Sequence, residues 1–385
     1  MSSERHFSLL IPGLLGALRE SAGDAQASMA DDDNPVRRVG DRQGWRKYWK
    51  RRSGFQYIAH PALGVAPALE TLLARADRAE PFPDTAADNA PLETSLFRLF
   101  DMSAPAGADL PVAAITRMAD GGEADDAWWL RADPVSLLPQ GGGLLLQPAA
   151  DLGLTLEQAR ALVDEILQVF ADDGWHLEAP VAHRWYLRPA MPSTLQTTPL
   201  ARVKGRDIHP YLPTGKDAKA WHVAMNEIQI LLHTAGVNVE RESRGQAPIN
   251  SLWFWGGGQC PVVPPVIWAH LWSDEVLSRG LAIVAGLSHS ALPKGADAWL
   301  ALATAGRHLL VLDSETGLAR VAETDRWPEF LMRLEQEWIA PLVAAVKSGN
   351  LDSVTLYSER GQRFHLTRQG LGRWWRRRRD LRHYQ

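Results

Sequence analysis

The stretch NSLWFWGGG, Asn250–Gly258, places two tryptophans and a phenylalanine directly before three glycines. Its first half is typical of a buried strand, in which Trp253 and Trp255 would share one face and Phe254 the other. The glycines are predicted to form a loop at the carboxyl edge of a sheet, where open α/β sheets bind ligands. A backbone without side chains lets an anion approach there. The alternative is a tight turn beneath a tryptophan-rich core.

Helical and strand patterns alternate on both sides of this stretch. Helices are predicted over PALETLLARADRA, PLETSLFRLFDM, TLEQARALVDEILQVFADDG, AWHVAMNEIQILLHTAG and RWPEFLMRLEQEWIAPLVAAVKSG. Thr155 is the expected N-cap of the third, with Gln158 three residues later and Gly174 as its stop. Strands are predicted over residues 7–11 and over AWWLRADPVSLL, GGGLLLQPA, HRWYLRP and GRHLLVLDS, and a hairpin over SVTLYSERGQRFHLT. This order predicts an α/β protein with a largely parallel sheet.

The composition of the 385 residues is that of a globular protein, with 45% hydrophobic and 22% charged residues and a net charge of −4. The overall charge does not favour a nucleic-acid partner. A single cysteine, Cys260, excludes a disulfide framework within the chain and a cysteine-based zinc cluster, and it is interpreted as a small buried residue. We find no apolar run of about 18 residues and no signal-peptide pattern, so the expected location is the cytoplasm.

Three motifs carry a resemblance to a known family: LRADPVSL (130–137), TTP followed by GRDIHPYLPTG (197–215), and GVNVERESRGQAPINSLWFWGGG (236–258). Their order resembles the cofactor-independent phosphoglycerate mutases of the archaeal type, within the alkaline-phosphatase-like superfamily. The chain looks closest to the bacterial, RpfE-type regulatory branch of that family. The resemblance implies an alkaline-phosphatase-like α/β core with a mostly parallel sheet flanked by helices, formed by residues 1–109 and 236–385. It also implies an inserted, smaller α+β domain over residues 110–235.

The resemblance further implies a site for two divalent metals, but this chain lacks several of the residues that would form it. Pro12 replaces the first metal-binding aspartate, and DSETGLARVAETD (313–325) has carboxylates but no histidine. Glu359 and His365 are not adjacent, whereas the mutases have a paired Asp-His there, and AGVN replaces HPVN. The other donors show no two-histidine metal spacing and are interpreted as solvated or hydrogen-bonded residues: His270, Asp274, His289, His308, Asp313 and Glu315. We therefore predict no metal, no cofactor and no catalytic residue.

The retained motifs contain the residues that would hold a phosphorylated acid: Arg131, Arg184, Arg206, Asn238, Arg241, Gly256, Gly257 and Gly258. Arginine offers a planar fork that suits phosphate or carboxylate, although a lone arginine is more often simply exposed. The resulting hypothesis is a catalytically degenerate mutase relative, a pseudoenzyme with a regulatory role. It would bind a phosphorylated or anionic small molecule, or a protein partner. The alternative is an active metal-dependent phosphoglycerate mutase or phosphoesterase with a rearranged site.

The segment GRWWRRRRDLRHYQ, residues 372–385, raises a second alternative. Four consecutive arginines after two tryptophans could bind anionic lipid or nucleic acid. The favoured interpretation is a solvated segment whose tryptophans pack on the body of the protein. One basic cluster on a mildly acidic chain supplies few phosphate contacts, so nucleic acid is the weaker alternative.

Overall fold

The computed structural model describes residues 4–12, 14, 64–79, 91–103, 107–140, 142–312, 327–358 and 361–384. The chain divides into two compact units, one formed by Met1–Phe82 with Ala291–Gln385 and the other by Pro83–Ser290. The domain boundaries expected near residues 110 and 235 remain a prediction. None of the helices in the described part of the chain has the length and hydrophobicity needed to cross a bilayer.

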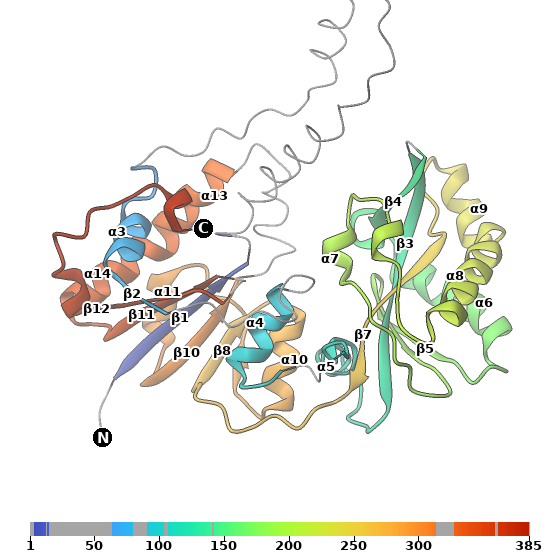
Figure 1. Cartoon of the computed structure of the whole chain (residues 1–385), viewed down its shortest axis with the longest axis horizontal. Coiled ribbons are helices and arrows are strands. Elements are labelled where there is room, and N and C mark those ends of the chain that lie inside the picture. Colours follow the sequence, from blue (N-terminus) through green and yellow to red (C-terminus); the bar gives the residue numbers. More distant parts are fainter. Residues whose placement is uncertain are drawn as a thin grey trace, which may run out of the picture. The chain divides into compact units, whose positions relative to one another are not determined.

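The first unit is built on β1 (Arg5–Ile11), whose run of apolar residues is almost fully buried. It lies between β10 (Gly306–Val311) and β11 (Ser353–Ser358), both parallel to it, although these strands come from opposite ends of the sequence (Figure 1). Beyond β11, the strands β12 (Arg363–Thr367) and β2 (Asp77–Ala79) are antiparallel. In the order β2-β12-β11-β1-β10 the three parallel strands are neighbours, with β1 between the other two, as expected for the α/β class.

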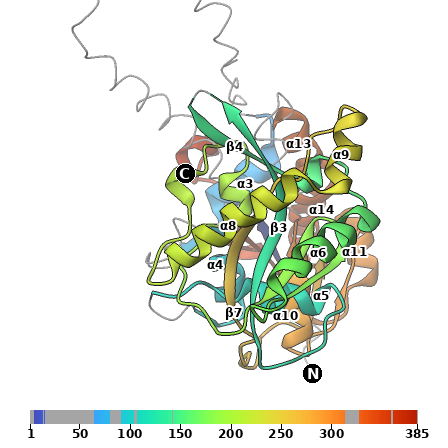
Figure 2. The same ribbon diagram turned by 90° about the vertical axis from the view of Figure 1, so that its right-hand side faces the viewer.

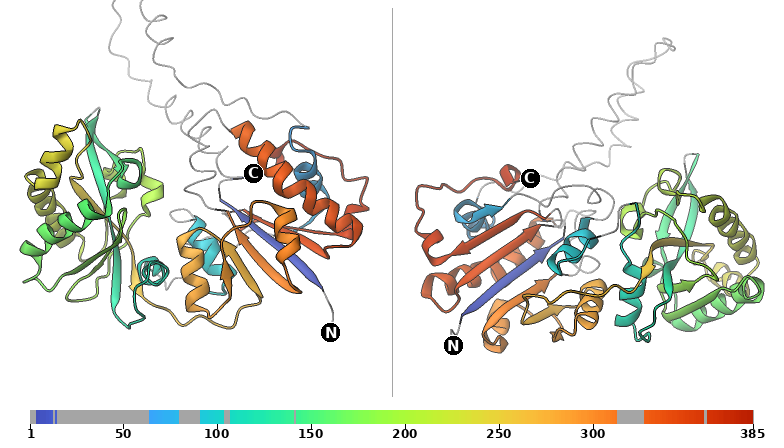
Figure 3. Two further views of the ribbon diagram at one scale, coloured as in Figure 1. Left: turned by 180° about the vertical axis from the view of Figure 1, so that it is seen from behind. Right: turned by 60° about the horizontal axis from the view of Figure 1, so that its bottom comes forward.

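Helices cover this sheet on the side of β11 and β12. Helix α3 (Pro67–Arg75) packs on β12 and α14 (Ala340–Ser348) on β11, as can be followed in the views of Figure 3. The remaining helices are α11 (Ala296–Leu302), α13 (Trp327–Leu334) and α15 (Arg368–Leu371), with a π-helical turn at Glu335–Ile339. Phe7 of β1 packs against Trp299 with ring centroids 4.6 Å apart, and the Trp338 ring centroid lies 6.0 Å from that of Phe7.

The second unit contains an antiparallel sheet centred on the long strand β3 (Trp128–Gln140). Strand β3 pairs with β4 (Gly143–Pro148), β6 (Arg184–Arg188) and β7 (Ser251–Gln259), and β6 pairs with β5 (His176–Val181). Further elements of this unit are α4 (Pro91–Leu99), α5 (Val112–Ala119), α7 (Leu200–Val203), α9 (Gly236–Ser243), β8 (His270–Ser273), α10 (Val276–Val284) and β9 (His289–Ser290).

Two helices, α6 (Leu156–Phe170) and α8 (Ala218–His233), lie side by side over the antiparallel sheet (Figure 2). Helix α6 begins with the predicted capping box, in which the Thr155 hydroxyl accepts the Gln158 N–H and the Gln158 amide accepts the Thr155 N–H. Gly174 follows with a φ of 75°, as expected for a helix stop. Phe254 of β7 faces these helices and meets the Trp221 ring with centroids 4.9 Å apart.

The opening stretch is a strand, but its neighbourhood differs from the prediction. Phe254 points toward α8, whereas the Trp253 and Trp255 indoles donate on the other side of the sheet, so the expected alternation is confirmed. The prediction of a loop at the carboxyl edge of a parallel sheet is wrong, because the glycines lie inside β7 and β7 runs antiparallel to β3. An apolar strand can be buried in a parallel or an antiparallel sheet, so its residues do not predict the orientation. Its partner, β3, lies more than a hundred residues earlier in the chain.

Candidate functional site

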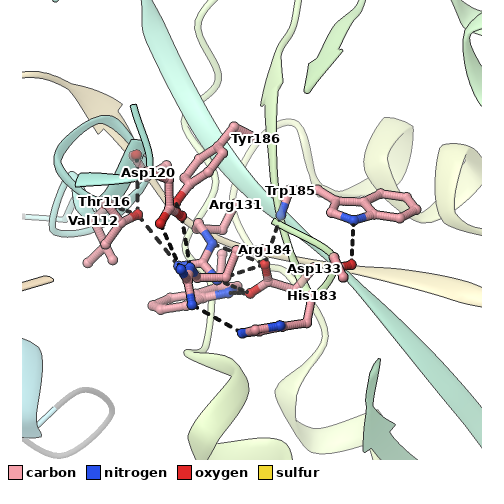
Figure 4. A network of polar contacts seen from close by, with 12 residues as sticks. Val112, Thr116, Asp120, Arg131, Asp133, His183, Arg184, Trp185 and Tyr186 are labelled. Carbon is pink, nitrogen blue, oxygen red and sulfur yellow. Dashed lines mark hydrogen bonds and ion pairs between the residues drawn. The ribbon is translucent and has the colours of Figure 1, made fainter. Parts of the chain in front are cut away.

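A buried polar network fills the space between α5, β3, β6 and β7 (Figure 4). Arg131 and Asp133 are two residues apart on β3 and therefore share one face of the strand. The Arg131 guanidinium donates from Nε at 3.0 Å and from Nη2 at 2.8 Å to the Asp133 carboxylate. The Trp255 indole donates to Asp133 Oδ2 at 2.7 Å, and the Trp185 N–H donates to Oδ1 at 3.4 Å. Asp133 is completely buried and Arg131 is 5% exposed.

A second ion pair completes the network. Asp120, the residue that ends α5, accepts from Arg184 Nε at 2.8 Å and Nη2 at 2.7 Å, and from the Tyr186 hydroxyl at 2.6 Å. Burial alone would raise the pKa of Asp120, but the hydrogen bonds from Arg184 and Tyr186 outweigh it and lower that pKa. Burial raises the pKa of Tyr186, so this phenol stays protonated as a donor.

The charges in this network balance, with two arginines paired to two aspartates. Arg117 of α5 forms a neighbouring pair with Glu178, with distances of 2.8 and 3.0 Å, and its guanidinium lies 4.0 Å from the Trp129 ring centroid. The Arg184 side chain is 15% exposed, so the network reaches solvent only at its rim. Arg131 and Arg184 therefore already have their anions within the fold.

The two residues on α9 that are predicted to bind a ligand, Asn238 and Arg241, form hydrogen bonds mainly with backbone atoms of the protein. The Asn238 amide donates to the carbonyls of Leu232 and Ile249 at 2.8 Å, and its oxygen accepts the Ile249 N–H at 2.8 Å. Arg241 is completely buried and donates at 2.8 to 3.1 Å to acceptors on three segments: Leu152 O, Gln158 Oε1 and Ala247 O. Burial lowers the pKa of Arg241. Both side chains fasten the segment before β7 to the helices α6 and α8.

A carboxyl group of the protein itself lies beside the glycine run. Asp109 accepts the Thr197 N–H at 3.1 Å and the Thr197 hydroxyl, and the N–H groups of Gly256 and Gly257 lie close to this carboxyl group. The Gly256 N–H donates to the Thr197 hydroxyl at 3.0 Å. Burial raises the pKa of Asp109, although the hydrogen bonds from Thr197 oppose the shift. A side chain of the protein therefore lies where the sequence predicts an anion loop.

Close packing explains why glycine occupies these positions. Gly256 has a φ of 66°, and β7 shifts register against β3 beside it. A Cβ at Gly257 would lie 2.4 Å from Cζ2 of Trp128, and a Cβ at Gly258 would lie 2.6 Å from Cβ of Pro111. The bulky and the small residues adjoin because the loop before α5 and the Trp128 ring pack directly on the bare backbone.

The predicted binding residues do not form one cluster. Asn238 and Arg241 bind at the beginning of β7 and the glycines lie near its end, about 20 Å away at 3.3 Å per residue. Arg206 follows α7 on a segment attached to β4, where Leu146 N–H donates to its carbonyl at 3.1 Å, and its side chain reaches the Tyr211 hydroxyl at 3.4 Å. Only Arg131 and Arg184 share a network.

The carboxyl edge of the parallel sheet is where the resemblance places metal ligands. Strand β1 ends at Ile11, beside Ser358 of β11. The next residue is the buried Pro12, whose side chain has no atom that could bind a metal. Ser358 exchanges hydrogen bonds with Gln362 at 3.2 and 3.3 Å. Within the described ranges, no group of three His, Cys, Asp or Glu side chains could hold a metal ion. The described residues at this edge do not fit a two-metal site, and the carboxylates Asp313, Glu315 and Glu359, which the sequence does not favour as metal ligands, lie outside the described residues.

The described histidine candidates lie apart and most of them have partners. His308 is buried in the middle of β10 and its Nε2 lies 2.9 Å from the Thr304 carbonyl. The His365 ring contacts the Thr355 hydroxyl at 2.9 Å across the β11–β12 pair, and His270 contacts the Ser290 hydroxyl at 3.0 Å. Burial lowers the pKa of both His308 and His365, which favours neutral rings. His289 is exposed on β9.

Several residues of these sites were not singled out by sequence. Asp133 and Thr197 lie inside quoted motifs, and the Arg131–Asp133 spacing on a strand indicates that the two share a face. Tyr186 follows Arg184 at the same spacing. Asp109 and Asp120 carry no sequence signal, because their partners come from distant strands.

The comparisons with known proteins converge on one family. The chain is 25% identical over 141 residues to a 2,3-bisphosphoglycerate-independent phosphoglycerate mutase from Methanosarcina barkeri, a match that covers 35% of each protein. It is 26% identical over 183 residues to a probable mutase of the same name from Geobacter sulfurreducens, covering 46% of this chain and 45% of that protein. These matches span between about a third and just under half of the curated relatives' own length.

No family model matches the chain. The cofactor-independent phosphoglycerate mutase from Thermoplasma acidophilum aligns with a TM-score of 0.41 and 14% identity, over 95% of this chain and 90% of that one. In the first unit, β1 is parallel to both of its neighbours, as expected of an α/β protein. The sequence matches over part of the chain support a relationship to the cofactor-independent phosphoglycerate mutases.

Proposed function

We propose that this protein is a catalytically degenerate member of the family that works by binding, in a regulatory role. The observation that carries the proposal is Pro12 at the end of the central strand β1. The family implies a metal-binding carboxylate at this position, and a phosphoserine intermediate needs metal charge in both half-reactions. Proline supplies neither charge nor a ligand atom. On the same departures we place the protein in the bacterial RpfE-type regulatory branch, and we further propose a cytoplasmic location.

The charge balance of the retained motifs favours a protein partner over a phosphorylated metabolite. Arg131 and Arg184 are neutralised by Asp133 and Asp120, and Arg241 is committed to carbonyl and amide oxygens. A phosphate would have to displace a bidentate carboxylate that is already in place. Charge-assisted forks of this kind are among the strongest hydrogen bonds in proteins.

A coupled assay for interconversion of 3- and 2-phosphoglycerate, with added manganese or cobalt, tests the proposal. We expect no turnover above the background rate, while a mutase such as the one from Methanosarcina barkeri provides the positive control. Elemental analysis of the purified protein should give no stoichiometric metal. Turnover that a chelator abolishes, or two equivalents of bound metal, would establish the alternative of an active enzyme with ligands from elsewhere in the chain.

Calorimetric titration with 3-phosphoglycerate decides between the two classes of ligand. We expect no saturable binding at millimolar concentrations. Arg184→Lys keeps a positive charge beside Asp120 but removes the fork, and Arg160→Lys, at an exposed position on α6, is the matched control. Saturable binding that only the Arg184 variant loses would show that the metabolite is the ligand.

A further inference from the structure

The segment Arg373–Arg379 places two exposed indoles beside a run of arginines. Trp374 is 77% exposed and Trp375 is 63% exposed, the two largest apolar side chains on the described surface. The sequence-based interpretation that these tryptophans pack on the body of the protein is therefore wrong. Large exposed aromatic residues of this kind mark interaction surfaces.

The two tryptophans are exposed although several contacts attach the segment Arg373–Arg379 to the first unit. Arg373 binds both oxygens of Asp77, at 2.5 and 3.1 Å, and Arg376 donates to the Ala76 carbonyl at 2.9 Å. After the segment, the Tyr384 ring lies under the guanidinium of Arg78, 4.6 Å from its centroid. The fold thus holds the indoles outward at a fixed place, next to α3 and β2.

The rest of the arginine run faces solvent. Residues 374–379 are all exposed, and Arg377 and Arg379 form no ion pair with a carboxylate among the described residues. Of the acidic groups around the run, Asp77 binds Arg373 and the buried Glu70 lies 3.9 Å from Arg378, while Asp380 directly follows the run. A chain with a net charge of −4 therefore presents a local cationic and aromatic face.

We propose that this face docks on the surface of an anionic lipid bilayer. Indoles prefer the boundary between headgroups and acyl chains, and clustered arginines are attracted to anionic headgroups and bind their phosphates. Single-stranded nucleic acid fits less well, since successive bases stack on roughly parallel aromatic platforms. The Trp374 and Trp375 rings are at 84° to each other with centroids 6.1 Å apart. A bilayer interface makes no such demand on ring orientation.

Co-sedimentation of the full chain with vesicles tests the proposal, using phosphatidylcholine vesicles with or without a minority of phosphatidylserine. We expect binding only to the anionic vesicles, weakening as salt is raised. Arg377→Gln with Arg379→Gln should reduce the affinity about 30-fold, at roughly a factor of five for each arginine near the surface. These two positions leave the contacts of Arg373 and Arg376 in place, so the fold is preserved. The control variant, Arg160→Gln with Arg244→Gln, removes the same charge elsewhere on the protein and should leave the affinity for the vesicles unchanged.

A second measurement follows the indoles themselves. Brominated acyl chains should quench part of the tryptophan fluorescence of the parent protein, and that quenching should disappear in Trp374→Ala with Trp375→Ala. The other 14 of the 16 tryptophans serve as the internal background. Absence of binding to anionic vesicles, or equal binding by the control and the Arg377/Arg379 variants, would overturn the proposal. Displacement of the protein from vesicles by a single-stranded oligonucleotide of higher affinity would assign the face to nucleic acid instead.

Discussion

Replacing Asp133 with asparagine should be among the most damaging single changes in the second unit. The side chain is completely buried, and its carboxylate accepts hydrogen bonds from Arg131, Trp255 and the Trp185 backbone. The substitution keeps the size of the side chain but leaves the Arg131 guanidinium, itself 5% exposed, without its counter-charge. Breaking one partner of a buried pair costs about 3–5 kcal/mol, a large share of a domain's stability of about 5–15 kcal/mol.

The same reasoning predicts that removing both charges is milder than removing one. Arg131→Met with Asp133→Leu leaves no buried charge, and apolar replacement of a whole buried pair is often neutral or stabilising. The Trp255 indole would still lose its acceptor, at about 1–3 kcal/mol. The double variant should therefore be more stable than Asp133→Asn, by about 1–3 kcal/mol.

Urea unfolding followed by tryptophan fluorescence measures these differences, with Asp164→Asn on the exposed side of α6 as the control. The control should stay within about 0.5 kcal/mol of the parent, as surface substitutions usually do. If Asp133→Asn unfolds with the parent's midpoint, or if the effects of Arg131→Met and Asp133→Leu simply add in the double variant, the two side chains are not an energetically coupled pair.

Three further predictions concern other parts of the second unit. Gly257→Val should lower the free energy of unfolding by about 1–3 kcal/mol or more, because its Cβ would lie 2.4 Å from Cζ2 of Trp128. The control is Gly236→Ala, whose Cβ would meet no atom within 4 Å. In the same denaturation assay this control should leave the free energy of unfolding nearly unchanged. Arg241→Met should destabilise by about 1.5–4.5 kcal/mol, since it removes three hydrogen bonds made by a completely buried side chain, and a loss below about 1 kcal/mol would contradict this reasoning. The lowered pKa of Asp120 makes its contribution complete above the ordinary value of 3.8 and lost as the pH falls through the lowered value, so acid titrations of stability should be steeper for the parent than for Asp120→Asn below pH 3.8.

Local signals in the sequence predicted local structure well. The Thr155–Gln158 capping box is confirmed because its two partners lie within one helical turn. The hairpin expected over residues 353–367 is confirmed as the antiparallel pair β11–β12, since the two strands are only a few residues apart in the sequence. The helix expected to end at Gly236 ends at His233, and a separate helix, α9, begins at Gly236.

Long-range pairings were beyond the sequence. The sequence predicts a ligand loop for the glycine run, whereas in the structure the Gly256 N–H donates to the Thr197 hydroxyl, which in turn binds Asp109, about 150 residues before Gly256 in the chain. Burial of Arg131 and Arg241 was equally hidden, because an arginine in a motif looks the same whether it faces solvent, a phosphate or an aspartate. Only the fold decides which anion or carbonyl reaches it first.

The central position of β1 has a consequence for how the protein is made. Its two neighbours, β10 and β11, are encoded about 300 residues later than β1 itself. At ribosomal rates of about 5–20 residues per second, the apolar strand waits about 15–60 s after its synthesis before either partner exists. Throughout that time both of its edges are open to other chains, which makes β1 the segment that nascent-chain chaperones must shield.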